Sequence, residues 1–183
     1  TVRTTVNAGT GDKAQLLAGW WSPSTDQDRD AVLSLLATQV LDLRLVADVR
    51  EELGATYSPS SYVALSTEPE PMVETTIMVT GDPAGMADLS EVIAGEVEAL
   101  RTDGVTDEEF SDALSNVRRE LGYVYQSDLV DVLVAHGLGD EQAIERYLGQ
   151  EELIRSIEQA DLDAFLVRVM PREPFVEVTV LPG

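Results

Sequence analysis

The sequence predicts an α+β fold in which helices cover one face of a mixed, mostly antiparallel β-sheet. Segments with strand character lie near both ends of the chain, and helical patterns are gathered between them. Within the predicted strand 73–80, apolar side chains such as Val73 and Ile77 alternate with polar ones such as Glu74 and Thr76. That alternation indicates a sheet with one buried face and one wetter face.

Length and composition favour a single domain over residues 1–183. A chain of 183 residues with 44% hydrophobic content can bury a sizeable core, and no repeat or low-complexity linker divides it. Because the chain begins with Thr1 rather than methionine, we expect a processed product or a piece of a larger protein.

Five strands are predicted. The first two flank a loop rich in glycine and Asx residues, which are turn formers, so we expect them to pair as a hairpin. The third and fourth are separated by a proline-containing segment that cannot pair regularly. The fifth closes the chain. The predicted strands are 2–6, 14–21, 57–65, 73–80 and 175–180.

A long, deeply buried helix is predicted between the second and third strands. Its apolar residues recur at helical spacing. Ser24 and Gln27 are spaced as a capping box at its start, and Gly54 would end it. The expected buried residues are Val32, Leu33, Leu36, Val40, Leu41, Leu43, Leu45, Ala47 and Val49.

Five further helices are expected after the fourth strand. Asp82 and Pro83 fit the N-cap and first position of one helix, and a capping box formed by Thr106 and Glu109 opens the next. The remaining helices are predicted over 127–135, 141–148 and 160–169.

The charge balance excludes several classes of partner. Thirty-four acidic residues against 12 basic ones give a net charge of −22. Nucleic acids and anionic membranes require basic patches, so neither is an expected partner, and acidic substrates are equally disfavoured. No apolar run is long enough to span a bilayer. We expect a soluble protein, either cytoplasmic or exported.

No complete catalytic site is visible in the sequence. The single histidine, His136, has no second histidine or cysteine with which to bind a metal. We therefore expect it to be a core or helix-end residue and not a metal ligand. No Gly-x-Ser-x-Gly nucleophile elbow is present, and cysteine is absent. The adjacent Trp20 and Trp21 could form a binding surface, but two aromatic residues at a strand end more often divide between the core and an interface.

One corner of the chain does suggest a binding site. Arg50 and Tyr57 lie seven residues apart, on either side of the predicted helix end at Gly54. The two side chains could therefore converge on one ligand. Simpler interpretations remain open, because a cation in the last turn of a helix is stabilised by the helix dipole and an aromatic residue is common at the start of a strand.

The stretch from Arg50 to Ser58 resembles the signature of the C-terminal, non-zinc-binding half of pitrilysin-type (insulinase) zinc metallopeptidases. The resemblance covers nearly the whole chain. It includes the ordered segments Gly11-Asp12-Lys13-Ala14-Gln15, Asp82-Pro83, Gly104-Val105-Thr106-Asp107-Glu108-Glu109-Phe110 and Val176-Glu177-Val178-Thr179-Val180-Leu181-Pro182. The extended form Tyr57-Ser58-Pro59-Ser60 is similar to the large bacterial zinc proteases of that family.

The resemblance implies one half of a clamshell peptidase. In that family two homologous α+β halves enclose a chamber, and the half without zinc contributes an arginine and a tyrosine that bind the substrate backbone. Those roles map onto Arg50 and Tyr57. The zinc motif His-x-x-Glu-His is absent from this sequence, so Zn²⁺ is expected on an N-terminal half, in the same polypeptide or a partner subunit. This chain alone is expected to bind no metal and cleave no peptide.

Two alternatives stay open at this point. The chain could be a non-catalytic scaffold or core subunit of the same fold, or a peptide-binding assembly module with no protease history. A His-x-x-Glu-His motif upstream in the parent gene would favour the peptidase.

Overall fold

The computed structural model describes residues 1–9, 11–53, 58–124, 128–139 and 141–183, with only the backbone of 9, 50–53, 121–124 and 128–129. The order of elements in these ranges confirms the predicted succession. The elements are β1 (Val2–Gly9), β2 (Ala14–Pro23), α1 (Gln27–Leu53), β3 (Ser58–Ser66), β4 (Met72–Gly81), the 3₁₀ turn η1 (Pro83–Gly85), α2 (Met86–Thr102), α3 (Asp107–Val124), α4 (Asp128–Gly137), α5 (Ala143–Ser156), α6 (Gln159–Val169) and β5 (Val176–Pro182).

The strands form one sheet in the order β1-β5-β2-β4-β3. Only β1 and β5 are parallel, so the sheet is mixed and mostly antiparallel, as predicted. The expected hairpin between the first two strands is wrong, because β5 lies between them. Val176 pairs with Val2 on one side and with Gly19 on the other. The closing strand thus satisfies backbone groups of both strands, a long-range pairing that the turn sequence alone could not reveal.

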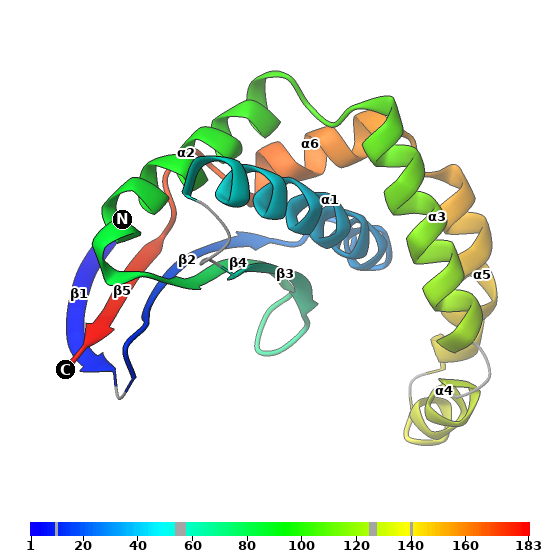
Figure 1. Cartoon of the computed structure of the whole chain (residues 1–183). Coiled ribbons are helices and arrows are strands. Elements are labelled where there is room, and N and C mark those ends of the chain that lie inside the picture. The colour runs from blue at the N-terminus through cyan, green and yellow to red at the C-terminus, as the bar shows by residue number, and fades with distance from the viewer. Residues whose placement is uncertain (10, 54–57, 125–127, 140) are drawn as a thin grey trace.

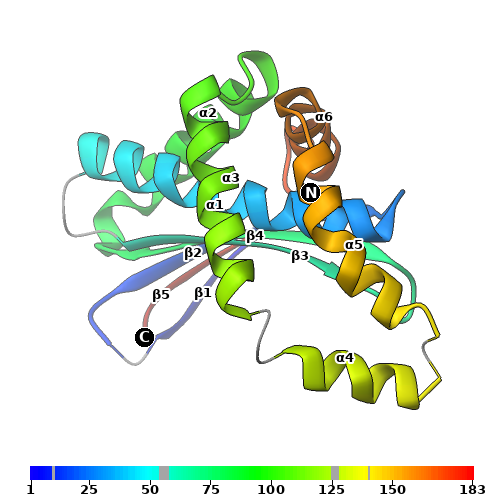
Figure 2. The same cartoon turned by 90° about the vertical axis from the view of Figure 1, so that its right-hand side faces the viewer.

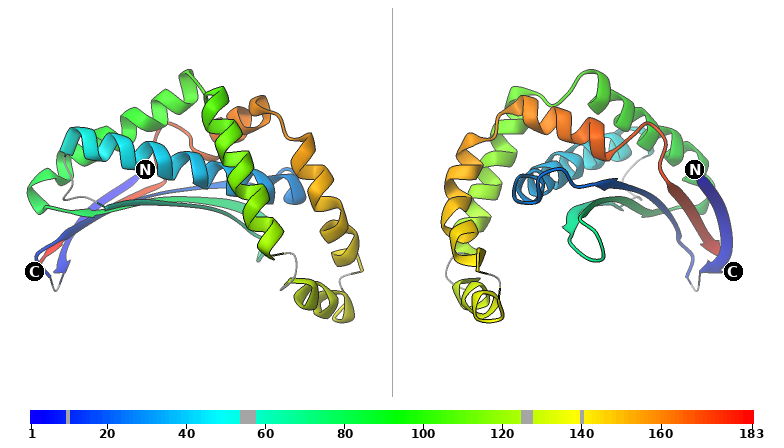
Figure 3. Two further views of the ribbon diagram at one scale, coloured as in Figure 1. Left: turned by 45° about the vertical axis from the view of Figure 1, so that its right-hand side comes forward. Right: turned by 180° about the vertical axis from the view of Figure 1, so that it is seen from behind.

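The helices that contact the sheet lie on one of its faces (Figure 1, Figure 2). Side chains that point from the sheet into this helical layer are almost fully buried. Examples are Leu16 and Trp20 of β2 and Ile77 of β4, with exposed fractions of 1%, 2% and 0%. None of the described helices covers the opposite, concave face of the sheet (Figure 3). We call this opposite side the open face.

Helix α1 crosses the helical layer and is the most deeply buried helix. Most of its predicted apolar residues are in the core, but Leu43 is 52% exposed and Ala47 is also exposed. The prediction was wrong for these two because the buried stripe runs through Leu41, Leu45 and Val49 instead. No helix formed by the described residues is both long enough and apolar enough to cross a membrane.

The start of α1 differs from the predicted capping box. Asp26 caps the helix, since its Oδ1 accepts a hydrogen bond of 3.2 Å from the backbone N–H of Arg29. The hydroxyl of Ser24 instead donates to Oδ2 of Asp30 at 2.8 Å. Sequence spacing fitted Ser24, but a carboxylate two residues later is an equally strong cap and lies next to the first helical residue.

The two other helix starts agree with the sequence. Asp82 Oδ1 accepts a hydrogen bond from the N–H of Ala84 at 2.9 Å, and Pro83 opens η1 just ahead of α2. Thr106 and Glu109 form the predicted capping box, because each side chain accepts a hydrogen bond from the other residue's backbone N–H.

Asp30 joins the start of α1 to α6. The residue is 2% exposed, and its carboxylate accepts hydrogen bonds from Ser24 Oγ and the N–H of Thr25. Arg168 of α6 pairs with its Oδ1 at 2.5 Å. Three hydrogen-bond donors offset most of the desolvation penalty of this buried carboxylate. Removing the carboxylate would leave those donors without an acceptor.

We therefore expect Asp30→Ala to lower the free energy of unfolding by about 3 kcal/mol, because Arg168 and the Ser24 hydroxyl lose their shared acceptor. Urea denaturation followed by circular dichroism measures this. Asp112→Asn on the exposed surface of α3 is the matched control and should change stability by less than about 0.5 kcal/mol. Equal effects of the two substitutions would contradict a structural role for Asp30.

Candidate functional site

The corner between α1 and β3 is fixed on both of its flanks. Oδ1 of Asp42 accepts hydrogen bonds from the backbone N–H of Ser61 at 2.7 Å and from its hydroxyl at 2.8 Å. One turn earlier, Thr38 Oγ1 accepts from the N–H of Val63 at 3.1 Å. These bonds hold α1 against β3 in one register. The two segments that enter and leave the corner are therefore set relative to each other.

The predicted site residues fall at this corner. Arg50 lies in the last turn of α1, and β3 begins at Ser58, directly after Tyr57. The side chain of Arg50 and the whole of Tyr57 lie outside the described residues, so their convergence stays a prediction.

The open face of the sheet divides into a polar part and an apolar part. On β3, Ser58, Ser60 and Tyr62 point to this face, opposite Thr80, Met78 and Thr76 of β4. Tyr62 is 59% exposed. On the other side of β4, the strands β2, β5 and β1 contribute apolar side chains. They are Leu17, Trp21, Val176, Val178, Val180, Val2 and Val6.

An aromatic pair lies over the apolar part. The ring of Trp21 meets the ring of Phe175 edge-on, with centroids 5.7 Å apart, and the two are 41% and 67% exposed. Gly19 makes room for this pair, because a Cβ there would lie 2.9 Å from the Trp21 ring. Trp20 points the other way, into the core, and its Nε1 donates to the carbonyl of Pro171 at 2.9 Å. The core position of Trp20 is confirmed, whereas an interface at the exposed Trp21 stays a prediction.

Sequence reasoning did not single out Tyr62 or Phe175. The signal for Tyr62 was its position next to Val63, which is 4% exposed and faces the core. Because neighbouring residues of a strand point to opposite faces, an aromatic residue beside a core valine must face outward. Phe175 carried no such signal, since it lies just before β5 begins.

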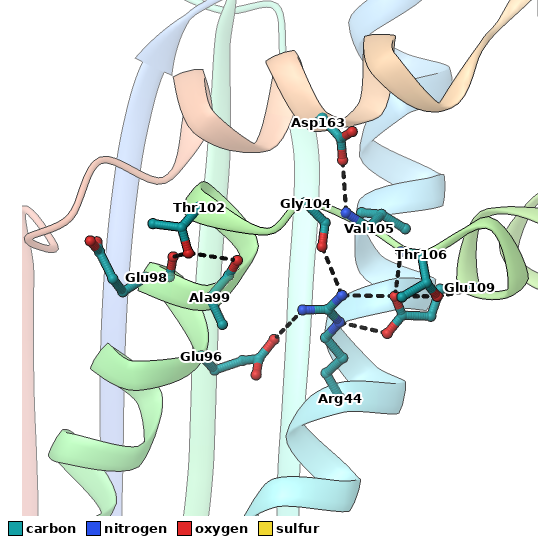
Figure 4. Close-up of polar contacts among 10 residues, drawn as sticks. All are labelled: Arg44, Glu96, Glu98, Ala99, Thr102, Gly104, Val105, Thr106, Glu109 and Asp163. Atoms are coloured by element: carbon teal, nitrogen blue, oxygen red, sulfur yellow. Dashed lines mark hydrogen bonds and ion pairs between the residues drawn. The ribbon is translucent and has the colours of Figure 1, made fainter.

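Arg44 of α1 is the centre of a polar network that joins three helices (Figure 4). Its guanidinium donates to both carboxylate oxygens of Glu109 on α3, at 2.6 and 2.7 Å, and to Glu96 on α2 at 3.1 Å. The fourth bond, of 2.9 Å, goes to the carbonyl of Gly104 in the α2–α3 connection. Such a bidentate, charge-assisted arrangement needs the planar fork of arginine, which lysine lacks.

The connection between α2 and α3 depends on Gly104. Its φ of +75° lies in the left-handed region, and a Cβ there would come within 3.0 Å of a carboxylate oxygen of Asp163. That same carboxylate accepts a hydrogen bond from the N–H of Val105 at 2.8 Å. The tight turn presents the Gly104 carbonyl to Arg44 on one side and Val105 to α6 on the other.

The pKa values of the two carboxylates bound to Arg44 are shifted in opposite directions. The pKa of Glu109 is lowered to about 2, chiefly by its hydrogen bonds from Arg44. Burial raises the pKa of Glu96 to about 7, and hydrogen bonding with Asp48 adds to this, while Arg44 acts against it. The side chain of Glu96 is 7% exposed, which explains why desolvation outweighs the ion pair. Hydrogen bonding to Glu109 also raises the pKa of Arg44.

The described residues do not fit a zinc ion. Among them, no group of three or more histidine, cysteine or carboxylate side chains is arranged to hold a metal. His136 lies exposed in the last turn of α4, so its helix-end position agrees with expectation while a core position was wrong. Helix α4 packs mainly on α5 at the rim of the molecule, and a polar side chain there remains hydrated.

Comparison with known proteins identifies a matching family model and similar folds. Residues 2–117 match the family model described as "Peptidase M16 inactive domain". No curated protein sequence matched the chain.

Solved structures share the fold over the whole chain. The periplasmic protease PqqL from Escherichia coli matches 100% of this chain with a TM-score of 0.75 and 18% identity. The ferredoxin protease FusC, solved as a mutant in complex with Arabidopsis ferredoxin, also matches 100% of this chain, with a TM-score of 0.78 and 18% identity. A peptidase M16 inactive domain from Pseudomonas fluorescens matches 100% of this chain with a TM-score of 0.73 and 17% identity. The chain spans 20% of the length of each of the first two proteins and 44% of the third.

The raised pKa of Glu96 predicts a pH-dependent stability. An acid whose pKa is higher in the folded state holds its proton better when folded. The contribution of Glu96 to the free energy of unfolding is therefore fully present below pH 4.5 and is lost as pH rises through 7. We expect Glu96→Gln to remove this loss. Relative to the unmodified protein, the variant should gain on the order of 1–3 kcal/mol between pH 5 and pH 8.

Urea denaturation across that pH range measures the difference. Glu109 does not interfere, because its lowered pKa removes stability only as pH falls from 4.5 toward 2. Glu152→Gln, at an exposed position on α5, is the control and should shift stability equally at every pH. A pH-independent difference for Glu96→Gln would show that Glu96 is ionised throughout.

Proposed function

Because this chain belongs to the peptidase M16 family as one of its inactive domains, we propose that it is the substrate-binding, non-zinc half of a zinc metalloendopeptidase. The match of residues 2–117 to the inactive-domain model is the observation that carries the proposal. The protease folds that share its architecture support it. The zinc ion and the residues that activate it would belong to an N-terminal half, in the same polypeptide or in a partner subunit.

The open face would line the chamber in which the peptide is held. Its polar part, on β3 and β4, offers hydroxyl groups beside an edge strand, and its apolar part offers the exposed pair Trp21 and Phe175. Among the described strands, β3 pairs only with β4. On the other edge of β3, the N–H groups of Ser61 and Val63 are already bonded to Asp42 and Thr38 of α1, so a peptide would pair with other backbone groups of this edge. An extended peptide aligned along such an edge is held by main-chain hydrogen bonds and tolerates varied side chains.

Arg50 and Tyr57 would bind the substrate backbone near the reacting peptide bond. A guanidinium offers fixed N–H donors, and a phenol offers one O–H donor that can reach a carbonyl oxygen as it acquires charge. The hydrogen bonds that backbone N–H groups of β3 donate to Asp42 and Thr38 support this role, because they hold both flanks of the corner in place. A donor that acts on developing charge must be positioned before the reaction, since reorganisation would cost part of its effect.

The test is Tyr57→Phe in the complete enzyme, which retains the zinc half. Loss of one donor to a developing charge commonly costs about 2.7–4 kcal/mol, so kcat should fall roughly a hundredfold to a thousandfold. Folding, followed by circular dichroism, and bound zinc, measured by metal analysis, should not change. Cleavage of a fluorogenic peptide library supplies the rate.

Tyr147→Phe is the matched control, because it removes a phenol from α5, away from both the open face and the corner. It should leave kcat within about threefold of the unmodified enzyme. Full activity of Tyr57→Phe would contradict the assigned role. If the complete, zinc-loaded protein cleaves no peptide, a scaffold subunit of the same fold would replace the peptidase as the better interpretation.

A further inference from the structure

A groove lies at the end of the molecule opposite the chain termini, between the start of α1, α4 and α5 (Figure 1). Its volume is about 940 Å³. Asp28 at this end of α1 and Arg50 at the other are separated by 22 residues, or roughly 33 Å at the helical rise of 1.5 Å per residue. The groove is therefore separate from the corner assigned to substrate binding.

The floor of the groove is apolar. Val32 and Leu35 of α1 form one side, Val132 of α4 forms another, and Leu153 of α5 closes it. Val32 is 3% exposed, whereas Leu35 is 40% exposed. Covering this exposed leucine with another apolar side chain would remove apolar surface from water and so favour binding.

The rim is acidic. Asp28, Asp131 and Glu145 are exposed, and they come from α1, α4 and α5 in turn. Together with Asp26, the described lining residues include four carboxylates and one guanidinium, that of Arg146. The Nε of Arg146 is 3.9 Å from Asp28 Oδ1, and both side chains are substantially exposed, at 39% and 59%. An ion pair this long and this wet neutralises little of the rim charge.

The two properties together specify the occupant. An apolar floor bordered by carboxylates from α1, α4 and α5 complements a helix that has an apolar stripe flanked by lysine or arginine. We propose that this groove binds a basic amphipathic helix of a partner protein. A second copy of this chain is a poor occupant, since it has only 12 basic residues and a net charge of −22.

The proposal is tested on the full-length protein with a fluorescent 18-residue helical peptide of leucine and lysine. Its partner probe has every lysine replaced by glutamate. The double substitution Asp131→Asn with Glu145→Gln should weaken binding of the lysine peptide about fourfold to 25-fold, since each exposed ion pair contributes about two- to fivefold. Binding should also weaken as salt is raised from 50 to 500 mM, because exposed charges are screened.

Matched controls separate the groove from the general negative charge of the protein. Asp88→Asn with Glu91→Gln changes the net charge equally but lies on α2, outside the groove lining. It should alter affinity by less than twofold. Leu35→Ser should weaken binding about fivefold, whereas Leu43→Ser, at a similarly exposed leucine of α1 outside the groove lining, should not.

Several results would overturn the proposal. Equal losses from the two double substitutions would mean that the peptide follows net charge only, and equal binding of the glutamate peptide would exclude the acidic rim. Displacement by spermidine with no effect of Leu35→Ser would identify a small polyamine ligand instead of a helix. A dimer that dissociates on Asp131→Asn with Glu145→Gln, seen by light scattering, would identify a second copy. None of these measurements depends on peptide cleavage.

Discussion

The burial of α1 against the sheet is the contact on which the remaining structure depends. Leu36, Val40, Leu41, Leu45 and Val49 are all fully buried, so the helix is fixed along most of its length by apolar packing. Because α1 is one continuous helix of 27 residues, its helical rise sets the separation of features far apart on it. The groove lies at its beginning, Arg44 near its middle and the corner with Arg50 at its end. One packed helix thus positions both the corner that we propose binds substrate and the separate acidic groove.

Polar contacts complete what apolar packing begins. Arg44 joins α1 to α2, α3 and their connection, and Asp42 and Thr38 join the same helix to β3. These groups lie on the parts of α1 that face neither full solvent nor the apolar core. Directional bonds at those positions select one register where hydrophobic contact alone would allow sliding. Fixed register matters for the proposed function, since a catalytic donor must be placed before charge develops.

Glu96 shows that the network is not uniformly stabilising. Its carboxylate is buried deeply enough that desolvation outweighs the attraction of Arg44, whereas the more exposed Glu109 keeps its charge easily. Two acids bound to one guanidinium therefore differ because of burial and the neighbouring Asp48. The network holds three helices together, and its ionisation changes near neutral pH.

The sequence by itself determined the α+β class, the succession of elements, the caps at Asp82 and Thr106, and the division of Trp20 from Trp21, because each depends on residues close in the chain. It also supplied the family resemblance centred on Arg50 and Tyr57. Only the tertiary structure decided that β5 separates β1 from β2, that Arg44 meets Glu96 and Glu109, and that an acidic groove forms between α1, α4 and α5. Apart from the neighbouring helices α4 and α5, those features join segments 50 or more residues apart. Pairing at that distance follows from burial of the whole chain and leaves no local pattern to read.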